Sequence, residues 1–259
     1  MSSGPALAAT APPARLAPPA HLAPPARLAP PAPGVCDLWF LPVRHRPAWV
    51  PLLSSRERDR LTQLGATPSG ASLVTSRAAQ RLVTARYLGV PPETVHPVRG
   101  CERCDHPSHG RPRVPGAPFD YSVSHCEEWL LIAVVGSGRV GADLDTVGPH
   151  RDVEGLARTA LTSAEHRAHL GLPEKARRAA FLTAWARKEA AVKLTGHGLA
   201  APPVLVDVAG PRATAPRVPD WPRSAPWLTD LPAPPGHAAA LATSEPLTAL
   251  RHRAEALDL

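Results

Sequence analysis

The 259-residue sequence has few aromatic residues and no long apolar run. Aromatic side chains make up only 4% of it. No stretch approaches the roughly 20 consecutive apolar residues that a membrane-spanning helix needs. The N-terminus also lacks the basic segment and following apolar segment of a secretory signal. These absences predict a cytoplasmic protein that does not cross a membrane.

Cysteine is scarce as well, with only four residues: Cys36, Cys101, Cys104 and Cys126. A chain of this size does not need disulfides to fold, so we expect reduced thiols. Cys101 and Cys104 form a C-x-x-C pattern that His106 and His109 follow closely. This group could bind zinc, but it lacks the second half of the usual pattern. A zinc site and a plain loop with reduced thiols both stay open.

Negative charge is in short supply, because 22 acidic residues face 29 basic ones and the formal net charge is +7. Such a surface favours polyanionic partners such as nucleic acid, a phosphorylated cofactor, anionic lipid or an acidic protein. A nucleic-acid-binding protein would use the Cys/His loop and an arginine-rich helix, but the expected mixture of basic and aromatic residues is absent. A catalytically silent interaction protein is a third hypothesis.

Proline, in contrast, is abundant, with 34 residues. Many lie in an imperfect hexapeptide repeat from Arg15 to Ala32, which reads RLAPPA, HLAPPA and RLAPPA. Paired prolines fix the backbone and remove donors, so the repeat predicts a disordered, polyproline-II-like tail over residues 1–33. In the third hypothesis, this tail is the active part.

The order of predicted elements is repeated along the chain. Each half reads as a strand, then helices, then strands, and the halves divide near residues 136–138. This order predicts an α+β fold of two similar lobes, 34–137 and 138–259, arranged as a pseudodimer with the active site between them. The predicted strands are 35–43, a hairpin over 119–136, 139–147, 203–209 and 237–243, and the predicted helices begin at Ser54 and span 73–88, 161–170 and 176–196.

The segment VGADLD carries two carboxylates on one face of a predicted strand, because side chains two residues apart point the same way. Asp143 and Asp145 would repel each other there, and a hard cation such as Mg²⁺ would relieve the repulsion. The plainer interpretation is an edge strand with two solvated acids. On the long helix, Trp185, Glu189 and Lys193 share one face and could complete a metal site. Glu189 and Lys193 could equally form an ordinary surface pair.

Three segments together resemble a known family. VGADLD, FLTAWARKEAAVKLTGHGL and SVSHCEEW look like the motifs of the 4′-phosphopantetheinyl transferases, in the order and spacing of that family. The similarity extends over residues 35–242 and is closest to the two-lobed, broad-specificity type that serves polyketide and non-ribosomal peptide synthesis. It implies a monomeric enzyme that transfers 4′-phosphopantetheine from coenzyme A to a serine of an apo acyl or peptidyl carrier protein, releasing 3′,5′-ADP.

The resemblance also implies roles for individual residues. Asp143, Asp145 and Glu189 match the metal carboxylates, with Mg²⁺ or Mn²⁺ as the ion. The family often has Glu at the place of Asp145, so the shorter Asp implies a looser or water-mediated contact. Glu189 also matches the general base, and Lys193 matches the lysine that handles the departing phosphate.

Other positions match the residues that hold coenzyme A. In the family, a helix arginine and a Ser-His pair contact the 3′-phosphate, a Lys or Arg lies near the adenine, and a further basic residue lies near the cofactor. The matching residues here are Arg77, Ser124, His125, Arg111 and Lys188, with Lys193 beside the diphosphate.

Overall fold

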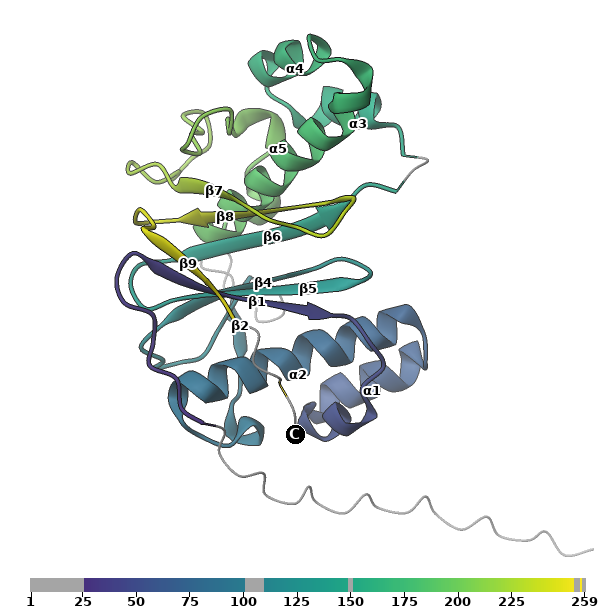
Figure 1. Cartoon of the computed structure of the whole chain (residues 1–259), viewed down its shortest axis with the longest axis vertical. Coiled ribbons are helices and arrows are strands. Elements are labelled where there is room, and N and C mark those ends of the chain that lie inside the picture. The colour runs from purple at the N-terminus through teal and green to yellow at the C-terminus, as the bar shows by residue number, and fades with distance from the viewer. Residues whose placement is uncertain (1–25, 101–109, 149–150, 254–256, 258–259) are drawn as a thin grey trace, which may run out of the picture.

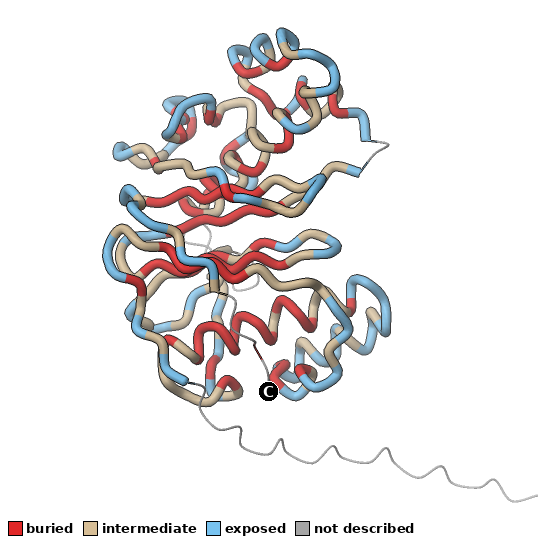
Figure 2. Tube along the Cα trace, in the orientation of Figure 1, coloured by how far each residue is buried: buried red, intermediate tan, exposed pale blue. Residues whose placement is uncertain are grey.

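The computed structural model describes residues 26–100, 110–148, 151–253 and 257. They form a mixed α+β fold with two sheets stacked between two layers of helices (Figure 1). The helices of the N-terminal half cover the outer face of one sheet, and those of the C-terminal half cover the outer face of the other. Burial is concentrated where these layers meet (Figure 2).

The first sheet has the strand order β4-β5-β1-β9, and the second has the order β6-β8-β7. All neighbours are antiparallel except β9, which runs parallel to β1. A separate two-stranded pair, β2 and β3, lies at the edge of the cavities described below. The strands are β1 (Val35–Pro42), β2 (Val98–Gly100), β3 (Arg111–Arg113), β4 (Asp120–His125), β5 (Trp129–Val135), β6 (Val140–Thr146), β7 (Trp227–Leu231), β8 (His237–Thr243) and β9 (Ala249–His252).

Both predicted capping boxes are present, since Ser54 pairs reciprocally with Glu57 and Thr162 with Glu165. These caps satisfy backbone N–H groups that have no partner inside the first turn of a helix. The α-helices are α1 (Ser55–Leu64), α2 (Pro68–Leu88), α3 (Val153–Ala160), α4 (Ser163–Leu170) and α5 (Glu174–Thr195). Short 3₁₀ helices span Pro47–Leu52, Pro92–Thr94, Gly198–Ala200 and Pro203–Leu205.

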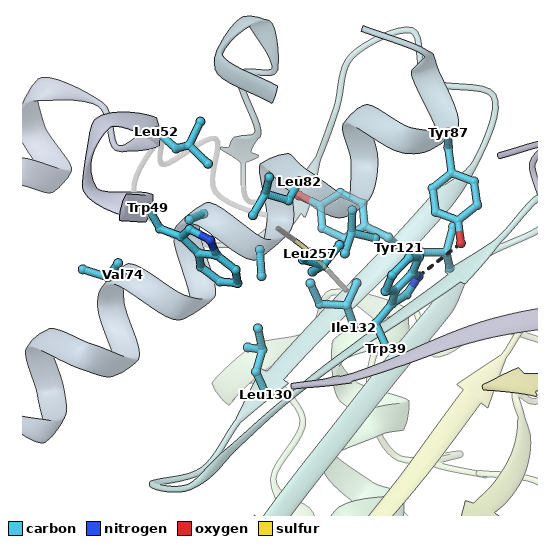
Figure 3. Close-up of a cluster of buried hydrophobic side chains, with 14 of the residues drawn as sticks. Trp39, Trp49, Leu52, Val74, Leu82, Tyr87, Tyr121, Leu130, Ile132 and Leu257 are labelled. Atoms are coloured by element: carbon cyan, nitrogen blue, oxygen red, sulfur yellow. Dashed lines mark hydrogen bonds between the residues drawn. The ribbon is translucent and has the colours of Figure 1, made fainter. Parts of the chain in front are cut away.

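Alternation along β5 explains the layering. Leu130, Ile132 and Val134 point toward α2, where they join a buried cluster that includes Trp39, Trp49, Tyr87 and Tyr121 (Figure 3). The residues between them, Leu131, Ala133 and Val135, point the other way and pack against Ala142, Leu144 and Leu241 of the second sheet. The same strand therefore contributes to two cores, as its nearly continuous apolar sequence allows.

Side chains on β4 hold the edge of β6 in place. The Asp120 carboxylate accepts the N–H of Val140 at 2.8 Å, and the Ser122 hydroxyl accepts the N–H of Ala142 at 2.9 Å. Ser124, two residues further on, donates to Asp143. Because these three residues lie on one face of β4, they take the place of a backbone ladder and fix β6 against the first sheet.

Helix α3 and strands β2, β3 and β7 were not predicted, and three further features differ from the sequence-based expectations. Residues 203–209 form a 3₁₀ turn and an isolated bridge at Asp207 instead of a strand. Strand β9 follows Gly138 in the sequence but belongs to the first sheet, where it pairs with β1. Arg251 and Arg253 form ion pairs there with the buried Asp37. The end of the predicted tail is packed, and Leu28 donates its N–H to the Arg86 carbonyl. Among the described helices, none is long and apolar enough to span a membrane.

Candidate active site

The long helix α5 lies close against β6 because Gly141 has no side chain. A Cβ at Gly141 would collide with the carbonyl of Ala190 on α5, so only glycine permits this approach. Gly141, Asp143 and Asp145 share one face of β6, and that face points toward α5. The glycine thus brings both carboxylates within reach of the helix.

Helix α5 contacts these carboxylates through residues that were predicted to share one helix face. The Lys193 ammonium donates to Asp143 Oδ1 at 2.6 Å, and the Trp185 indole donates to Asp145 Oδ2 at 3.0 Å. Glu189 lies between them in the helix, one turn from each. Two residues of this helix face thus contact the two aspartates, and Glu189 is near enough for the charges of Asp143, Asp145 and Lys193 to act on its pKa.

The three carboxylates are close enough to influence each other's protonation. Burial, followed by the negative charges of Asp143 and Asp145, raises the pKa of Glu189, while Lys193 opposes the rise. Burial and the charge of Asp143 likewise raise the pKa of Asp145, against a backbone N–H of Thr146 and the Trp185 indole. Glu189 is accordingly a better proton acceptor than a solvated glutamate.

The chemistry of this donor set fits a hard divalent cation. Asp143 is 5% exposed, and its buried Oδ2 has no hydrogen-bond partner among the residues that the structure describes. An orphaned carboxylate oxygen beside two further carboxylates is costly unless positive charge joins it. Within the described ranges, however, no three His, Cys, Asp or Glu side chains are arranged as a ready metal cluster. The full set Asp143, Asp145 and Glu189 stays a prediction, while one or two carboxylates plus substrate phosphates match the habit of Mg²⁺.

A cavity of about 600 Å³ opens beside this cluster. Glu189 and Lys193 form part of its wall, Arg111 and Arg99 lie across from them, and the loop from Gly196 to Ala200 closes one side. A second cavity of about 320 Å³ lies next to it, since Arg99 and Pro112 line both.

The second cavity is strongly basic. Its five arginines face a single acid, Glu57, which pairs with Arg81 at 2.8 Å and with Arg77 at 3.6 Å. Such an excess of positive charge suits a phosphate group. The arginines are Arg56, Arg60, Arg77, Arg81 and Arg99.

His125 stands near this cavity at the exposed end of β4. Its Nδ1 lies 3.2 Å from the Ser72 hydroxyl. Partial desolvation, followed by the positive charges of Lys193, Arg77 and Arg99, lowers the pKa of His125. The structure thus brings two of the predicted phosphate residues, Arg77 and His125, into one electrostatic neighbourhood.

The side chain of Ser124 points to the opposite face of β4 from the side chain of His125. Its hydroxyl is buried and is bonded to Asp143 Oδ1 at 2.9 Å and to Lys193 Nζ at 2.9 Å. Neighbouring strand residues point to opposite faces, which separates the predicted Ser-His pair. Arg111 lines the larger cavity, where its guanidinium also bonds to Asp120 and to the Val140 carbonyl.

Lys188 does not lie where the family resemblance implied. Its side chain is 1% exposed and pairs with Glu165 at 2.6 Å, away from both cavities. It also donates to the carbonyls of Pro203 and Val206. The placement of Lys188 beside the cofactor is wrong in this structure, because Lys188 lies about 100° around the helix from Glu189 and faces α4.

Sequence reasoning missed Arg99 and His197. Arg99 lines both cavities, and its buried Nε has no hydrogen-bond partner. His197 lines the larger cavity and is anchored by its Nε2 to the Pro219 carbonyl at 3.0 Å. No local pattern marks Arg99, because only the pairing of β2 with β3 carries it to the cavities. The proposed zinc residues Cys101, Cys104, His106 and His109 lie outside the described residues.

Comparison with known proteins agrees with this geometry. The relatives include the 4′-phosphopantetheinyl transferases HetI of Nostoc sp. (strain PCC 7120), 29% identical over 57% of this chain and 61% of HetI, and AcpT of Salmonella typhimurium, 30% identical over 46% of this chain and 57% of AcpT. A third is psf-1 of Bacillus pumilus, 32% identical over 35% of this chain and 38% of psf-1. The matches thus span at most about three fifths of these relatives.

The family model that matches is described as the 4′-phosphopantetheinyl transferase superfamily, and it covers residues 139–242. This range begins next to β6 and ends within β8, so it contains Asp143, Asp145, Glu189 and Lys193. Residues 139–242 therefore form a domain of the 4′-phosphopantetheinyl transferase superfamily.

Proposed function

We propose that this chain transfers the 4′-phosphopantetheine of coenzyme A to a serine of an apo acyl or peptidyl carrier protein, in the manner of a Mg²⁺-dependent holo-carrier-protein synthase. The observation that carries the proposal is the arrangement of Asp143, Asp145, Glu189 and Lys193 at the edge of the 600 Å³ cavity, inside the region that matches the family. The two-lobed, broad-specificity type, a monomeric state and a cytoplasmic location belong to the same proposal.

In the proposed reaction, the serine oxygen attacks the phosphorus that carries pantetheine. A new P–O bond forms, the bridging P–O bond of the diphosphate breaks, and 3′,5′-ADP leaves. Glu189 accepts the proton of the serine hydroxyl, and its raised pKa suits it to that role. Lys193 carries positive charge at the cavity wall and can neutralise or protonate the departing phosphate.

The proposed nucleotide contacts follow from the basic cavity. Arg77 and His125 would hold the 3′-phosphate. Arg99 lines both cavities, so its positive charge would act on the diphosphate as well as on the 3′-phosphate. Arg111 would lie near the adenine. Arginine suits these positions, since its planar group forms paired bonds with phosphate oxygens and keeps its charge.

Asp143 and Asp145, with Glu189, would hold Mg²⁺, and the bound ion would supply neutralising charge for the diphosphate. The buried, unpartnered Oδ2 of Asp143 is the structural support for this role. Lys193 already occupies Oδ1, so Oδ2 is the oxygen that this chain keeps for a second cation.

The net charge of +7 supports an acidic carrier protein as partner, because opposite charge speeds encounter. The nucleic-acid-binding hypothesis would explain that charge equally well, but it gives no role to Asp143, Asp145 or Glu189. The family match lends it no support.

The test is to incubate the protein with coenzyme A, Mg²⁺ and several apo carrier proteins, and to weigh each carrier by mass spectrometry. We expect a gain of one phosphopantetheine that depends on Mg²⁺ and disappears with Glu189→Ala. The Lys175→Ala variant is a matched control, since Lys175 lies on the same helix but lines neither of the two cavities beside the site. No gain on any carrier would overturn the proposal.

A further inference from the structure

The third hexapeptide of the N-terminal repeat, Arg27–Ala32, is folded onto the N-terminal half of the molecule. The backbone N–H of Leu28 donates to the Arg86 carbonyl at 2.8 Å, in the last turn of α2. The Leu28 side chain packs against the buried cluster shown in Figure 3. Pro31 is buried as well. This segment is therefore part of the fold and not a solvated tail.

Two glycines shape the surface that receives the segment. A Cβ on Gly136 would collide with the carbonyl of Pro31, so the backbone of Pro31 lies directly on this glycine. Gly89, the C-cap of α2, has a φ of +69°, and a Cβ there would lie 2.9 Å from Cδ of Arg27. We call this surface, made by Arg86, Gly89, Gly136 and the adjoining cluster, the hexapeptide seat.

The chemistry of the segment suits the seat. Carbonyls in the last turn of a helix have no partner within it, and Leu28 supplies a donor to one of them. The two prolines bring no N–H groups that would need partners on burial. They also favour an extended backbone before binding, which lowers the entropy lost on ordering.

The three copies of the repeat differ only in their first residue, whose side chain in the bound copy passes over Gly89 at the rim of the seat. Their first residue is Arg15, His21 or Arg27, and Arg27 is exposed in the structure. The residues that the seat covers are the leucine in second place and the prolines in fourth and fifth place, and these are identical in all three copies. The one variable place is thus an exposed residue, and the buried or partly buried places are constant.

We propose that the N-terminal half carries a binding site for the peptide Xaa-Leu-Ala-Pro-Pro-Ala, and that the copies at 15–20 and 21–26 are interchangeable with Arg27–Ala32 as its occupant. The site is independent of the proposed catalytic function. Its ligand class is a short proline-rich peptide with one leucine anchor, and the ligand is supplied by the chain itself.

Deleting residues 27–32 from the full chain tests the proposal. The deletion joins Ala26 to Pro33 and moves Leu22 and Pro25 into the places of Leu28 and Pro31. We expect the melting temperature to stay within about 1 °C of the parent, because an equivalent occupant has entered the seat. Replacing residues 27–32 by Gly-Ser-Gly-Ser-Gly-Ser keeps the length but should lower it by roughly 5 °C.

The substitution Leu22→Asp separates occupancy from mere chain length. In the parent chain, Leu22→Asp should leave the melting temperature unchanged. In the deletion chain, the same substitution should lower the melting temperature by roughly 5 °C. Leu28→Asp should cause the same loss in the parent chain. The proposal is overturned if the deletion itself destabilises the protein as strongly as the Gly-Ser replacement. It is equally overturned if Leu22→Asp is silent in the deletion chain.

Discussion

Helix α5 carries two lysine–carboxylate pairs with the same N–O distance of 2.6 Å, yet their surroundings differ completely. Lys188 and Glu165 are closed in, with side chains 1% and 6% exposed. Lys193 is 31% exposed at a cavity wall, and its partner Asp143 keeps one oxygen without a hydrogen bond.

The closed pair is fully satisfied. Lys188 adds two loop carbonyls to its carboxylate, and Glu165 also accepts the N–H of Val208 at 2.7 Å. The pair therefore ties α4, α5 and the loop after α5 together. In the open pair, one carboxylate oxygen of Asp143 has no hydrogen-bond partner among the described residues, and Lys193 lines the 600 Å³ cavity. The contrast teaches that satisfaction of the surrounding polar groups, and not the ion pair itself, distinguishes a structural centre from a reactive one.

The largest expected effect is at the open centre. Glu189→Gln keeps the shape but removes the proton acceptor, and we expect kcat for carrier modification to fall about 10²- to 10⁴-fold. Stability should not fall. A carboxyl whose folded pKa is raised destabilises the fold above its ordinary pKa, so neutralising Glu189 should hold or raise the melting temperature at pH 7. Steady-state kinetics and calorimetry together check this, and a lowered melting temperature would contradict it.

The closed centre should show the opposite pattern. Lys188→Met leaves the buried Glu165 without its partner, and we expect the free energy of unfolding to drop by about 3–5 kcal/mol. Activity per folded molecule should stay within about twofold, because Lys188 lines neither the 600 Å³ nor the 320 Å³ cavity beside the site. Urea titration and active-site-normalised rates measure the two quantities.

A second variant keeps this prediction open to contradiction. Glu165→Gln added to Lys188→Met removes the stranded charge, and it should recover part of the lost stability. If the double variant is no more stable than Lys188→Met alone, the unpaired carboxylate is not the cause of the loss.

Lys193→Met completes the comparison with a smaller effect on catalysis. It removes the cation at the departing phosphate, and we expect kcat to fall by about 100-fold. Its cost in stability should be smaller than that of Lys188→Met, since Lys193 is partly exposed and the Ser124 hydroxyl still donates to Asp143. Equal losses of stability in the two lysine variants would remove the distinction between the centres.

The open centre was visible in the sequence, and the closed one was not. The spacing of Asp143 and Asp145 on a strand and of Glu189 and Lys193 on a helix fixes which side chains share a face. Periodicity alone left solvated acids and a surface pair equally open, and only the resemblance of three motifs to a family favoured a site. Lys188 was misplaced because its partner, Glu165, lies 23 residues away and its other partners are loop carbonyls. No local pattern encodes such contacts.

The same reasoning explains the errors in the fold. The segment 203–209 is apolar and alternating, but Pro203 has no N–H and the N–H of Val208 goes to Glu165, so no ladder forms. Strand β9 has only four residues and little burial, and it is held by Arg251 and Arg253 on a buried Asp37 that lies over 200 residues earlier. Elements fixed by distant partners escape prediction, whereas the two helices with capping boxes and the long apolar strand β5 do not.

The smallest expected effect concerns His125, which is close enough to Arg77 and Arg99 of the basic cavity for their charges to act on it, and which belongs to neither lysine pair. Its lowered pKa means that it is neutral at pH 7.5 in the free protein. Protonation at lower pH adds a positive charge beside Arg77, and this charge favours a bound 3′-phosphate. We therefore expect the KM for coenzyme A to decrease by about 2- to 5-fold as the pH falls below the ordinary histidine pKa of about 6.5.

Two controls isolate this contribution. His125→Gln should flatten the pH profile, since the amide cannot gain a proton. With 3′-dephospho-coenzyme A the parent protein should also lose the dependence, because the phosphate that the imidazolium would contact is missing. A decrease of KM that persists with the dephosphorylated substrate would contradict the assignment to His125 and the 3′-phosphate. Protonation of Glu189 at low pH is distinguishable, because its raised pKa lowers kcat instead.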